Sequence, residues 1–178
     1  MTKDSILTFR FLRVIAWLIF IGLCIEAGAI LVNFVYSIWK PEIVKHLYND
    51  LDLSNMYSRG KHVFFWMYGL ILFVYLAKAF LFYLVIELVQ KLDITKPFSP
   101  FVTQKINQIS IFTFVAGVVS SIGRYSTKYL AIGEIEISQL STFWVDDKAF
   151  MLMSGVLFVI ASIFKVGVSL QNENDLTV

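Results

Sequence analysis

The sequence predicts an all-α fold, an integral membrane four-helix bundle whose long third helix starts before the membrane. Four apolar stretches recur along the 178 residues, at about 14–39, 63–89, 106–130 and 149–170. The hydrophobic fraction is 58%, the charged fraction 16% and the mean hydropathy +0.73, whereas soluble domains carry about 25% charged residues. About 20 apolar helical residues cross a hydrocarbon core of about 30 Å. A single transmembrane domain over residues 1–178 is therefore expected.

The first span is expected to begin after Arg13 and to end before Pro41, because proline disfavours helix at the residue that precedes it. Trp17 and Trp39 would then lie near the two membrane interfaces, as in an aromatic belt. In the polar segment that follows, apolar residues stand at positions 43, 44, 47, 48 and 51. This spacing predicts a short amphipathic helix lying on the membrane surface.

The third helix is expected to start near Pro100, since Ser99 is a good N-cap and proline suits the first helical position. Its most apolar part, 109–122, is short for a span. The helix is therefore expected to continue past Gly123 to about Leu130.

The second and fourth spans are expected over about 63–89 and 148–169. A polar tail, 171–178, follows the fourth span. In the loop before that span, Trp144 is expected to lie on the membrane surface, since tryptophan is enriched at that depth.

The distribution of charge does not fix the orientation of the chain in the membrane. The net charge is +2, which is too small to indicate direct binding of nucleic acid. Lysine and arginine are divided evenly between the two sides of the expected bundle, so the positive-inside rule gives a tie. Arg10 and Arg13 beside the first span favour termini in the cytoplasm. The single cysteine, Cys24, is expected to be a buried thiol.

Glu26 and Lys78 are the ionisable residues deepest in the apolar stretches. A charge inside the membrane is costly unless it is paired or hydrated, so such residues are candidates for function. Both lie about 17 Å from the same interface, at about 1.5 Å per residue. Three interpretations stay open: a polar site for a proton, ion or ligand, a buried pair that fixes the packing of two helices, and two separately hydrated groups.

The sequence contains no arrangement of residues that indicates an enzyme. It lacks GxSxG, HExxH and P-loop motifs. A metal site needs three or four convergent ligands, and the two histidines, His46 and His62, lie in one loop without a cysteine or histidine cluster. We therefore expect no catalytic, metal-binding or cofactor-binding residues, and no cofactor.

Two segments carry a family resemblance. Lys96-Pro97-Phe98-Ser99 precedes an isoleucine rhythm at positions 102, 106 and 109, and the chain ends in Asn174-Asp175-Leu176-Thr177-Val178. In both features the chain resembles the DUF2975 family, small four-helix membrane proteins of bacteria and archaea. The family often has an arginine in this part of the third helix, and Lys105 is its nearest counterpart here.

The resemblance implies a multi-pass protein of the plasma (inner) membrane with both termini in the cytoplasm. It also implies a partner, a helix-turn-helix transcription regulator, tethered or modulated through the 90–108 loop and the C-terminal tail. The alternatives are a small transporter or immunity-type protein using the Glu26–Lys78 pair, a structural subunit of a membrane complex, and a tail that folds back on Lys96 or Lys105. Besides lipid and this regulator, a homo-oligomer is left open. The docking candidates are Pro97, Phe98, Lys105, Glu173, Asn174, Asp175 and Leu176.

Overall fold

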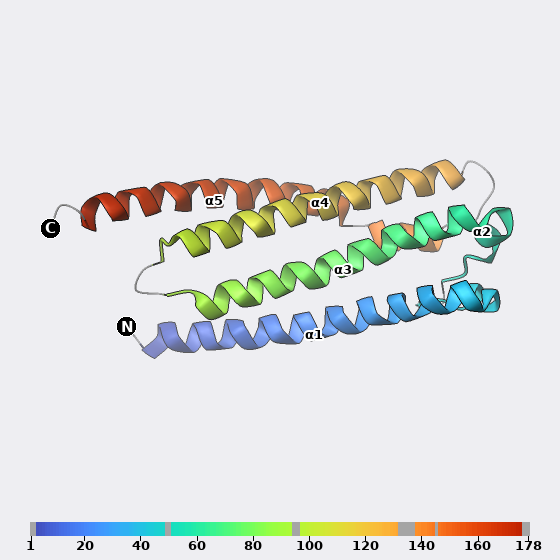
Figure 1. Cartoon of the computed structure of the whole chain (residues 1–178), viewed down its shortest axis with the longest axis horizontal. Coiled ribbons are helices and arrows are strands. Elements are labelled where there is room, and N and C mark those ends of the chain that lie inside the picture. Colours follow the sequence, from blue (N-terminus) through green and yellow to red (C-terminus); the bar gives the residue numbers. More distant parts are fainter. Residues whose placement is uncertain (1–2, 49–50, 94–96, 132–137, 145, 176–178) are drawn as a thin grey trace.

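The computed structural model describes residues 3–48, 51–93, 97–131, 138–144 and 146–175, and within them the chain is almost entirely helical (Figure 1). The all-α prediction is confirmed. The elements in order are α1 (Lys3–Trp39), η1 (Pro41–Lys45), α2 (Ser54–Arg59), α3 (Lys61–Lys91), α4 (Pro100–Ala131), η3 (Ser138–Trp144) and α5 (Asp147–Asp175).

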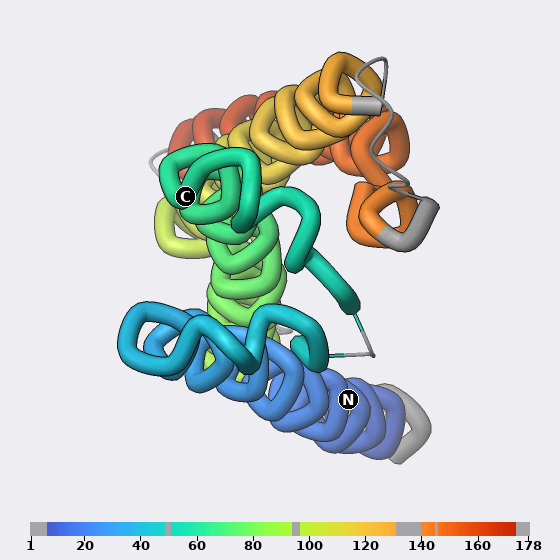
Figure 2. The backbone as a smooth tube through the Cα atoms, turned by 90° about the vertical axis from the view of Figure 1, so that its right-hand side faces the viewer, coloured from blue at the N-terminus to red at the C-terminus, as the bar shows by residue number. Residues whose placement is uncertain are grey.

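The four long helices α1, α3, α4 and α5 run side by side, each antiparallel to the one before it, so both termini lie at one end (Figure 1). We call this the terminal end and the opposite one the loop end. The closest packing joins α4 to α5, while α1 packs mainly on α3. Figure 2 shows α1 and the α4–α5 pair on opposite sides of α3. The bundle is therefore open, and α3 is the helix that connects its two halves.

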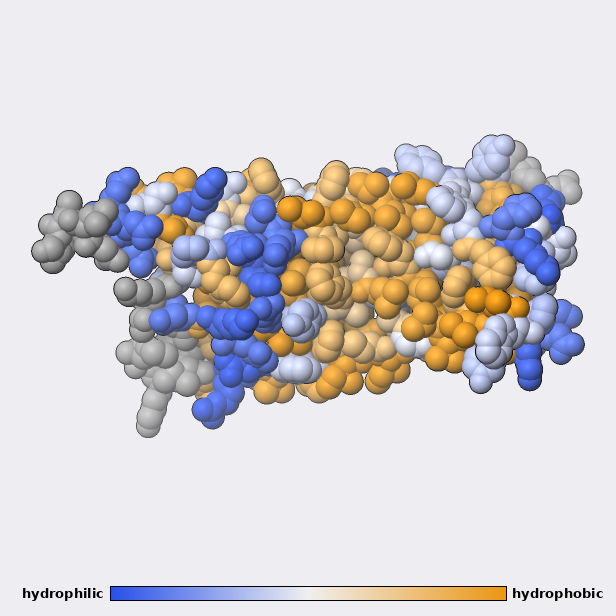
Figure 3. Space-filling model, in the orientation of Figure 1, coloured by the Kyte–Doolittle hydropathy of each residue, from blue (hydrophilic) through white to orange (hydrophobic). Residues whose placement is uncertain are grey.

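Each long helix is long and apolar enough to cross a membrane. Among the described residues, the candidate spans are Leu7–Trp39, Lys61–Lys91, Pro100–Leu130 and Leu140–Glu173. The face shown in Figure 3 has a broad apolar band across the middle, with hydrophilic residues gathered toward the two ends. This arrangement suits a membrane protein, since hydrocarbon requires an apolar surface between two polar ends.

The largest core lies at the loop end, where apolar side chains of η1, α2 and η3 pack with those of α1 and α3. The hydroxyl of Tyr68 on α3 donates a hydrogen bond of 3.1 Å to the Ile30 carbonyl on α1. The buried members of this core are Ile30, Val44, Leu47, Leu51, Leu53, Met56, Phe64, Met67, Tyr68, Ile71, Val74, Leu140, Phe143 and Trp144.

The expected amphipathic helix over positions 43–51 is wrong. The described residues there form the 3-10 helix η1, which ends at Lys45, and Leu47 and Leu51 pair as an isolated antiparallel bridge. Val44, Leu47 and Leu51 are buried in the loop-end core. The apolar spacing therefore reflects packing in the loop-end core. A periodic apolar pattern does not distinguish contact with protein from contact with lipid.

The expected start of the third helix is confirmed. α4 begins at Pro100, and the Ser99 hydroxyl accepts a hydrogen bond of 3.3 Å from the Val102 amide, as an N-cap does. The helix also runs past Gly123, to Ala131. The expectation for Trp144 is wrong, since this residue is only 1% exposed and belongs to the loop-end core.

α1 and α5 extend further toward the terminal end than expected. α1 already begins at Lys3, and α5 continues through the polar tail to Asp175. Neither extension contains a glycine or proline that would end a helix. Apolarity therefore located the long helices correctly, but it did not predict how far α1 and α5 extend beyond the apolar stretches.

Candidate functional site

Lys78 forms an ion pair with Asp146, which directly precedes α5. The distance from Lys78 Nζ to Asp146 Oδ2 is 3.1 Å. The same ammonium lies 5.3 Å from the ring centre of Tyr75 and 5.7 Å from that of Phe150. Glu26 is partly buried on α1. Among the described residues, no ion pair joins Glu26 to Lys78.

The depth inferred for the two residues nevertheless agrees with the packing of α1 on α3. Phe20 meets Tyr83, with ring centres 6.4 Å apart, and Phe34 stacks on Tyr68 at 5.4 Å. Glu26 lies between the two α1 positions, and Lys78 lies between the two α3 positions. The two residues differ in direction, because Lys78 turns toward α5.

Tyr75 lies beside one of the two sequence candidates. Lys78, the candidate on α3, lies over its ring and also pairs with Asp146. Sequence spacing placed Glu26 and Lys78 at one depth, while the contacts of Lys78 include Asp146 and Tyr75.

A second ion pair fixes the first turn of α5 on α4. Arg124 Nη2 lies 2.7 Å from Asp147 Oδ2, and the Ser121 hydroxyl donates a hydrogen bond of 3.1 Å to the same oxygen. The Asp147 side chain is only 2% exposed. An acidic residue in the first turn of a helix is also stabilised by the helix dipole. We call Lys78, Ser121, Arg124, Asp146 and Asp147 the inner charged cluster.

Sequence reasoning missed most of this cluster, because it considered only Glu26 and Lys78, the ionisable residues deepest in the apolar stretches, as candidates. A signal was present, however. Two adjacent aspartates stand directly before an apolar run, and an arginine follows the shortest apolar stretch. Charges at the ends of two consecutive spans can meet when those helices are antiparallel.

Trp144 anchors η3 to α4 beside this cluster. Its Nε1 donates a hydrogen bond of 2.9 Å to Thr127 Oγ1, and the Thr127 hydroxyl donates one of 2.9 Å to the Gly123 carbonyl. Gly123 offers no side chain, so the indole ring lies against the α4 backbone. These contacts hold η3 against α4, just before α5 begins.

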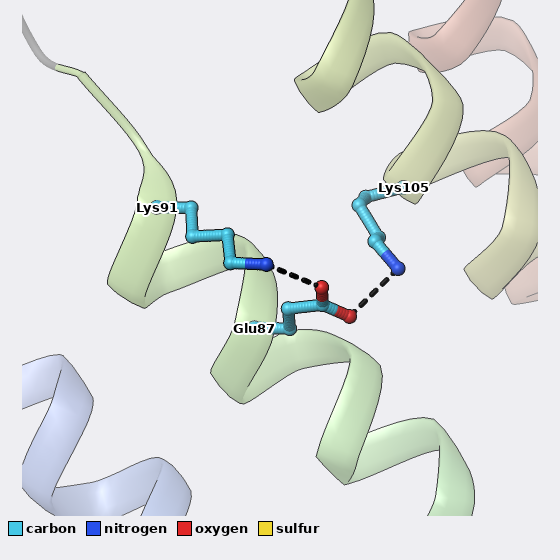
Figure 4. A network of polar contacts seen from close by, with 3 residues as sticks. All are labelled: Glu87, Lys91 and Lys105. Carbon is cyan, nitrogen blue, oxygen red and sulfur yellow. Dashed lines mark hydrogen bonds and ion pairs between the residues drawn. The ribbon is translucent and has the colours of Figure 1, made fainter.

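Glu87 organises the terminal end of α3 and α4 (Figure 4). Its carboxylate accepts Lys91 Nζ at 2.9 Å and Lys105 Nζ at 2.7 Å. Both ammonium groups also lie over the Phe101 ring, at 5.5 and 5.9 Å from its centre. The predicted docking residue Lys105 is therefore engaged with α3 and is mostly buried.

Phe98, another predicted docking residue, packs onto α5. Its ring lies 5.2 Å from that of Phe164 and occupies the space where a side chain at Gly167 would stand. Pro97, which precedes it, is exposed. These contacts fix the connection before α4 to the side of α5.

Of the tail candidates, Glu173 is exposed on the last described turn of α5. Asn174 and Asp175 belong to the helix, but their side chains lie outside the description, as do Lys96 and Leu176. Lys105 is paired with Glu87. The alternative of a tail folded back on Lys96 or Lys105 lies mostly outside the described residues and stays a prediction.

A groove of about 540 Å³ runs between the start of α4 and the end of α5. Its lining is unusual for helices of such apolarity, because hydroxyl and amide side chains form much of it. The polar lining residues are Thr103, Gln104, Asn107, Ser162, Lys165 and Ser169. We call this the α4–α5 groove.

The described residues include no group of three histidine, cysteine or acidic side chains placed to hold a metal ion. The chain matches no family model, no curated protein and no solved structure. The resemblance to DUF2975 therefore stays a prediction, and the candidate sites depend on geometry alone.

Proposed function

We propose that the protein is a multi-pass protein of the plasma membrane, with both termini in the cytoplasm. Four helices of sufficient length and apolarity support the membrane location. The shared position of the termini agrees with an even number of crossings. Lysine and arginine are evenly divided between the two ends, so the cytoplasmic orientation is supported by Arg10 and Arg13, which flank the first span, and by the resemblance to DUF2975.

Within this placement, the protein binds and regulates a cytoplasmic partner at its terminal end and is not an enzyme. The observation that carries this proposal is the polar lining of the α4–α5 groove. An amide side chain facing hydrocarbon without a partner costs several kcal/mol. Gln104 and Asn107 on the outer side of α4 therefore favour contact with water or with another protein.

The partner that fits is a protein offering a helix, since a groove between two helices suits an amphipathic helix. A helix-turn-helix regulator is a partner of this kind, and the resemblance to DUF2975 favours it. The exposed Glu173 at the end of α5 suits the basic surface of a DNA-binding protein. Phe98 and Lys105 serve this function indirectly, because they hold the connection before α4 in place.

In-cell crosslinking followed by affinity purification from native membranes tests the proposal. The full chain is compared with a chain truncated after Gln171 and with the double variant Asn107→Leu/Lys165→Glu. Leu152→Ala is the matched control, since Leu152 is an exposed apolar residue of α5 outside the groove.

Recovery of a soluble DNA-binding protein by the full chain and the control, but not by the two altered chains, would support docking at the terminal end. Equal recovery by all four chains, or recovery of membrane proteins alone, would contradict it.

The Lys78–Asp146 ion pair favours a second candidate, a small transporter or immunity-type protein. An ion pair within an apolar band is a common mark of a solute or proton pathway. Asp146→Asn should then abolish the transport or immunity activity and leave the recovery of a cytoplasmic partner unchanged. Truncation after Gln171 should abolish that recovery and leave the activity unchanged.

A further inference from the structure

The exposed side of α1 carries a continuous apolar line of residues. They follow one another at alternating spacings of four and three, which gives the period of about 3.5 residues that keeps one side of a helix against a partner helix. Apart from a glycine, all of them are large apolar residues with exposed side chains, from 45% exposed at Val35 to 83% at Trp39. We call this line the α1 seam, and its members are Leu7, Phe11, Val14, Leu18, Ile21, Ile25, Gly28, Val32, Val35 and Trp39.

The fold of the single chain does not use this seam. α1 packs on α3 through its opposite side, where Ala16, Ala27 and Ile30 are buried. The buried line and the seam are offset by two residues, which corresponds to about 200° around a helix. Figure 2 shows α1 at the edge of the molecule, separated from the α4–α5 pair by α3. The seam is therefore open to a partner from outside the chain.

Lipid alone does not account for the length of the seam. From Leu7 to Trp39 the helix rises about 48 Å, whereas the hydrocarbon core is about 30 Å thick. Even a tilt of about 40°, the upper end of the usual range, leaves about 37 Å along the membrane normal. Arg10 and Arg13 place the excess at the terminal end, where Leu7 and Phe11 are exposed. Large apolar side chains exposed outside the hydrocarbon favour contact with protein.

The shape of the seam suits another helix at two places. A hollow of about 530 Å³ lies at its terminal end, and the described residues that line it all belong to α1, with Leu7, Phe11 and Val14 among them. Further along, a Cβ atom added to Gly28 would have no neighbour within 4 Å, so no described neighbour requires a glycine there. Glycine weakens a helix, but small residues let two membrane helices approach closely.

We propose that α1 pairs along the seam with α1 of a second copy of this chain. Copies of one chain insert into the membrane with one orientation, so the two α1 helices run parallel. In a two-fold contact the same surface meets on both copies, and the seam then supplies its own complement. None of the seam residues is charged, so pairing in register brings no like charges together. The proposal rests on the membrane placement given above, but not on partner docking.

Disulfide crosslinking of the full chain in native membranes tests the contact. In a Cys24→Ser background, Phe11→Cys and Val32→Cys place a thiol on the seam. Leu31→Cys is the control on α1, exposed at nearly the same depth but off the seam, and Val159→Cys is an exposed control on α5. Membranes are oxidised with copper phenanthroline, and covalent dimers are measured by mass on non-reducing gels. The two seam positions should form at least about fivefold more dimer than either control, because a disulfide needs Cα atoms about 4.4–6.8 Å apart.

A second measurement uses the open space at Gly28. Energy transfer between fluorescently labelled copies of the full chain is recorded in liposomes over a range of protein-to-lipid ratios. Gly28→Leu should weaken self-association at least about tenfold, since the new side chains hold the two backbones apart. Gly155→Leu is the matched control, because Gly155 also has no atom within 4 Å of an added Cβ but lies on α5. This control should associate like the wild type, and melting temperatures show whether both variants are folded.

Equal crosslinking at the seam and control positions, or none at all, would overturn the proposal. A crosslinked product whose mass requires a different protein would overturn the second copy as the occupant of the seam. Unchanged energy transfer in folded Gly28→Leu would also overturn the pairing. None of these results alters the expected recovery of a partner at the terminal end. Release of the chain from membranes by alkaline carbonate would instead contradict the membrane placement, and the pairing with it, so the failures are distinguishable.

Discussion

The indole ring of Trp144 occupies the space beside Gly123 in which a side chain would otherwise stand. A Cβ atom added to Gly123 would lie 2.6 Å from the nearest ring atoms. The ring cannot shift freely, because its Nε1 is bonded to Thr127 one turn further along α4. This contact attaches η3 to α4 and so positions Asp146 and Asp147, which come directly afterwards.

Gly123→Ala should therefore destabilise the protein by about 1–3 kcal/mol, the usual cost of overpacking a buried contact. Thermal unfolding of the purified protein in detergent measures the effect. Gly155→Ala is the matched control, since Gly155 is also within a long helix but has no neighbouring atom within 4 Å of an added Cβ. The control should be neutral or slightly stabilising, as alanine favours helix over glycine. Equal melting temperatures for the two variants would disprove the close contact.

Asp147→Asn should destabilise the start of α5, because Arg124 would lose its counterion while staying largely buried. Removing one member of a buried ion pair costs about 3–5 kcal/mol, and partial exposure of Arg124 lowers the expected loss to about 2–3 kcal/mol. Unfolding in detergent at neutral pH provides the measurement.

Lys91→Ala serves as the comparison for Asp147→Asn, since Lys91 is well exposed and Glu87 keeps Lys105 as a partner. It should have little effect, as exposed ion pairs contribute little. If Lys91→Ala lowered the stability as much as Asp147→Asn, the buried Arg124–Asp147 pair would not stabilise the protein more than the exposed Lys91–Glu87 pair, contrary to this prediction.

The number and order of the long helices followed from apolar length, and the start of α4 followed from Ser99 and Pro100. These features depend on residues close together in the sequence. The partner of Lys78 did not follow, because spacing gives the depth of a side chain along a helix but not the direction in which it points. Asp146 reaches the ammonium because η3 packs on α4 directly before α5 begins.

Trp144 and the segment over positions 43–51 show the same limitation. Each has a composition that suits a membrane surface, yet Trp144 and, in the segment, Val44, Leu47 and Leu51 are buried in the loop-end core. In a chain with so many apolar residues, the pattern that predicts contact with lipid also predicts contact with protein. Three-dimensional packing is needed to distinguish them.

Acidification should weaken the start of α2. Hydrogen bonds from the hydroxyl and the backbone N–H of Ser54 hold the pKa of the Asp52 carboxyl below its ordinary value. A group whose pKa is lowered by folding stabilises the protein at pH values above its unfolded pKa, and this stabilisation is lost as the pH falls through the folded pKa. The wild type should therefore be more stable than Asp52→Asn at neutral pH, with the difference shrinking below about pH 4. Melting temperatures of both proteins between neutral and acidic pH test this, and a constant difference would contradict it.

Phe98 and Gly167 should be energetically coupled, because the ring fills the space that the glycine leaves open on α5. Gly167→Ala should displace Phe98 and cost about 1–3 kcal/mol in unfolding free energy. In a Phe98→Ala background the same substitution should be nearly neutral, since the ring that clashes is gone. The coupling energy from this double-mutant cycle should therefore be about 1 kcal/mol or more. Additive effects would show that the connection before α4 is not held by α5, which would also remove the indirect role given to Phe98 in docking a partner.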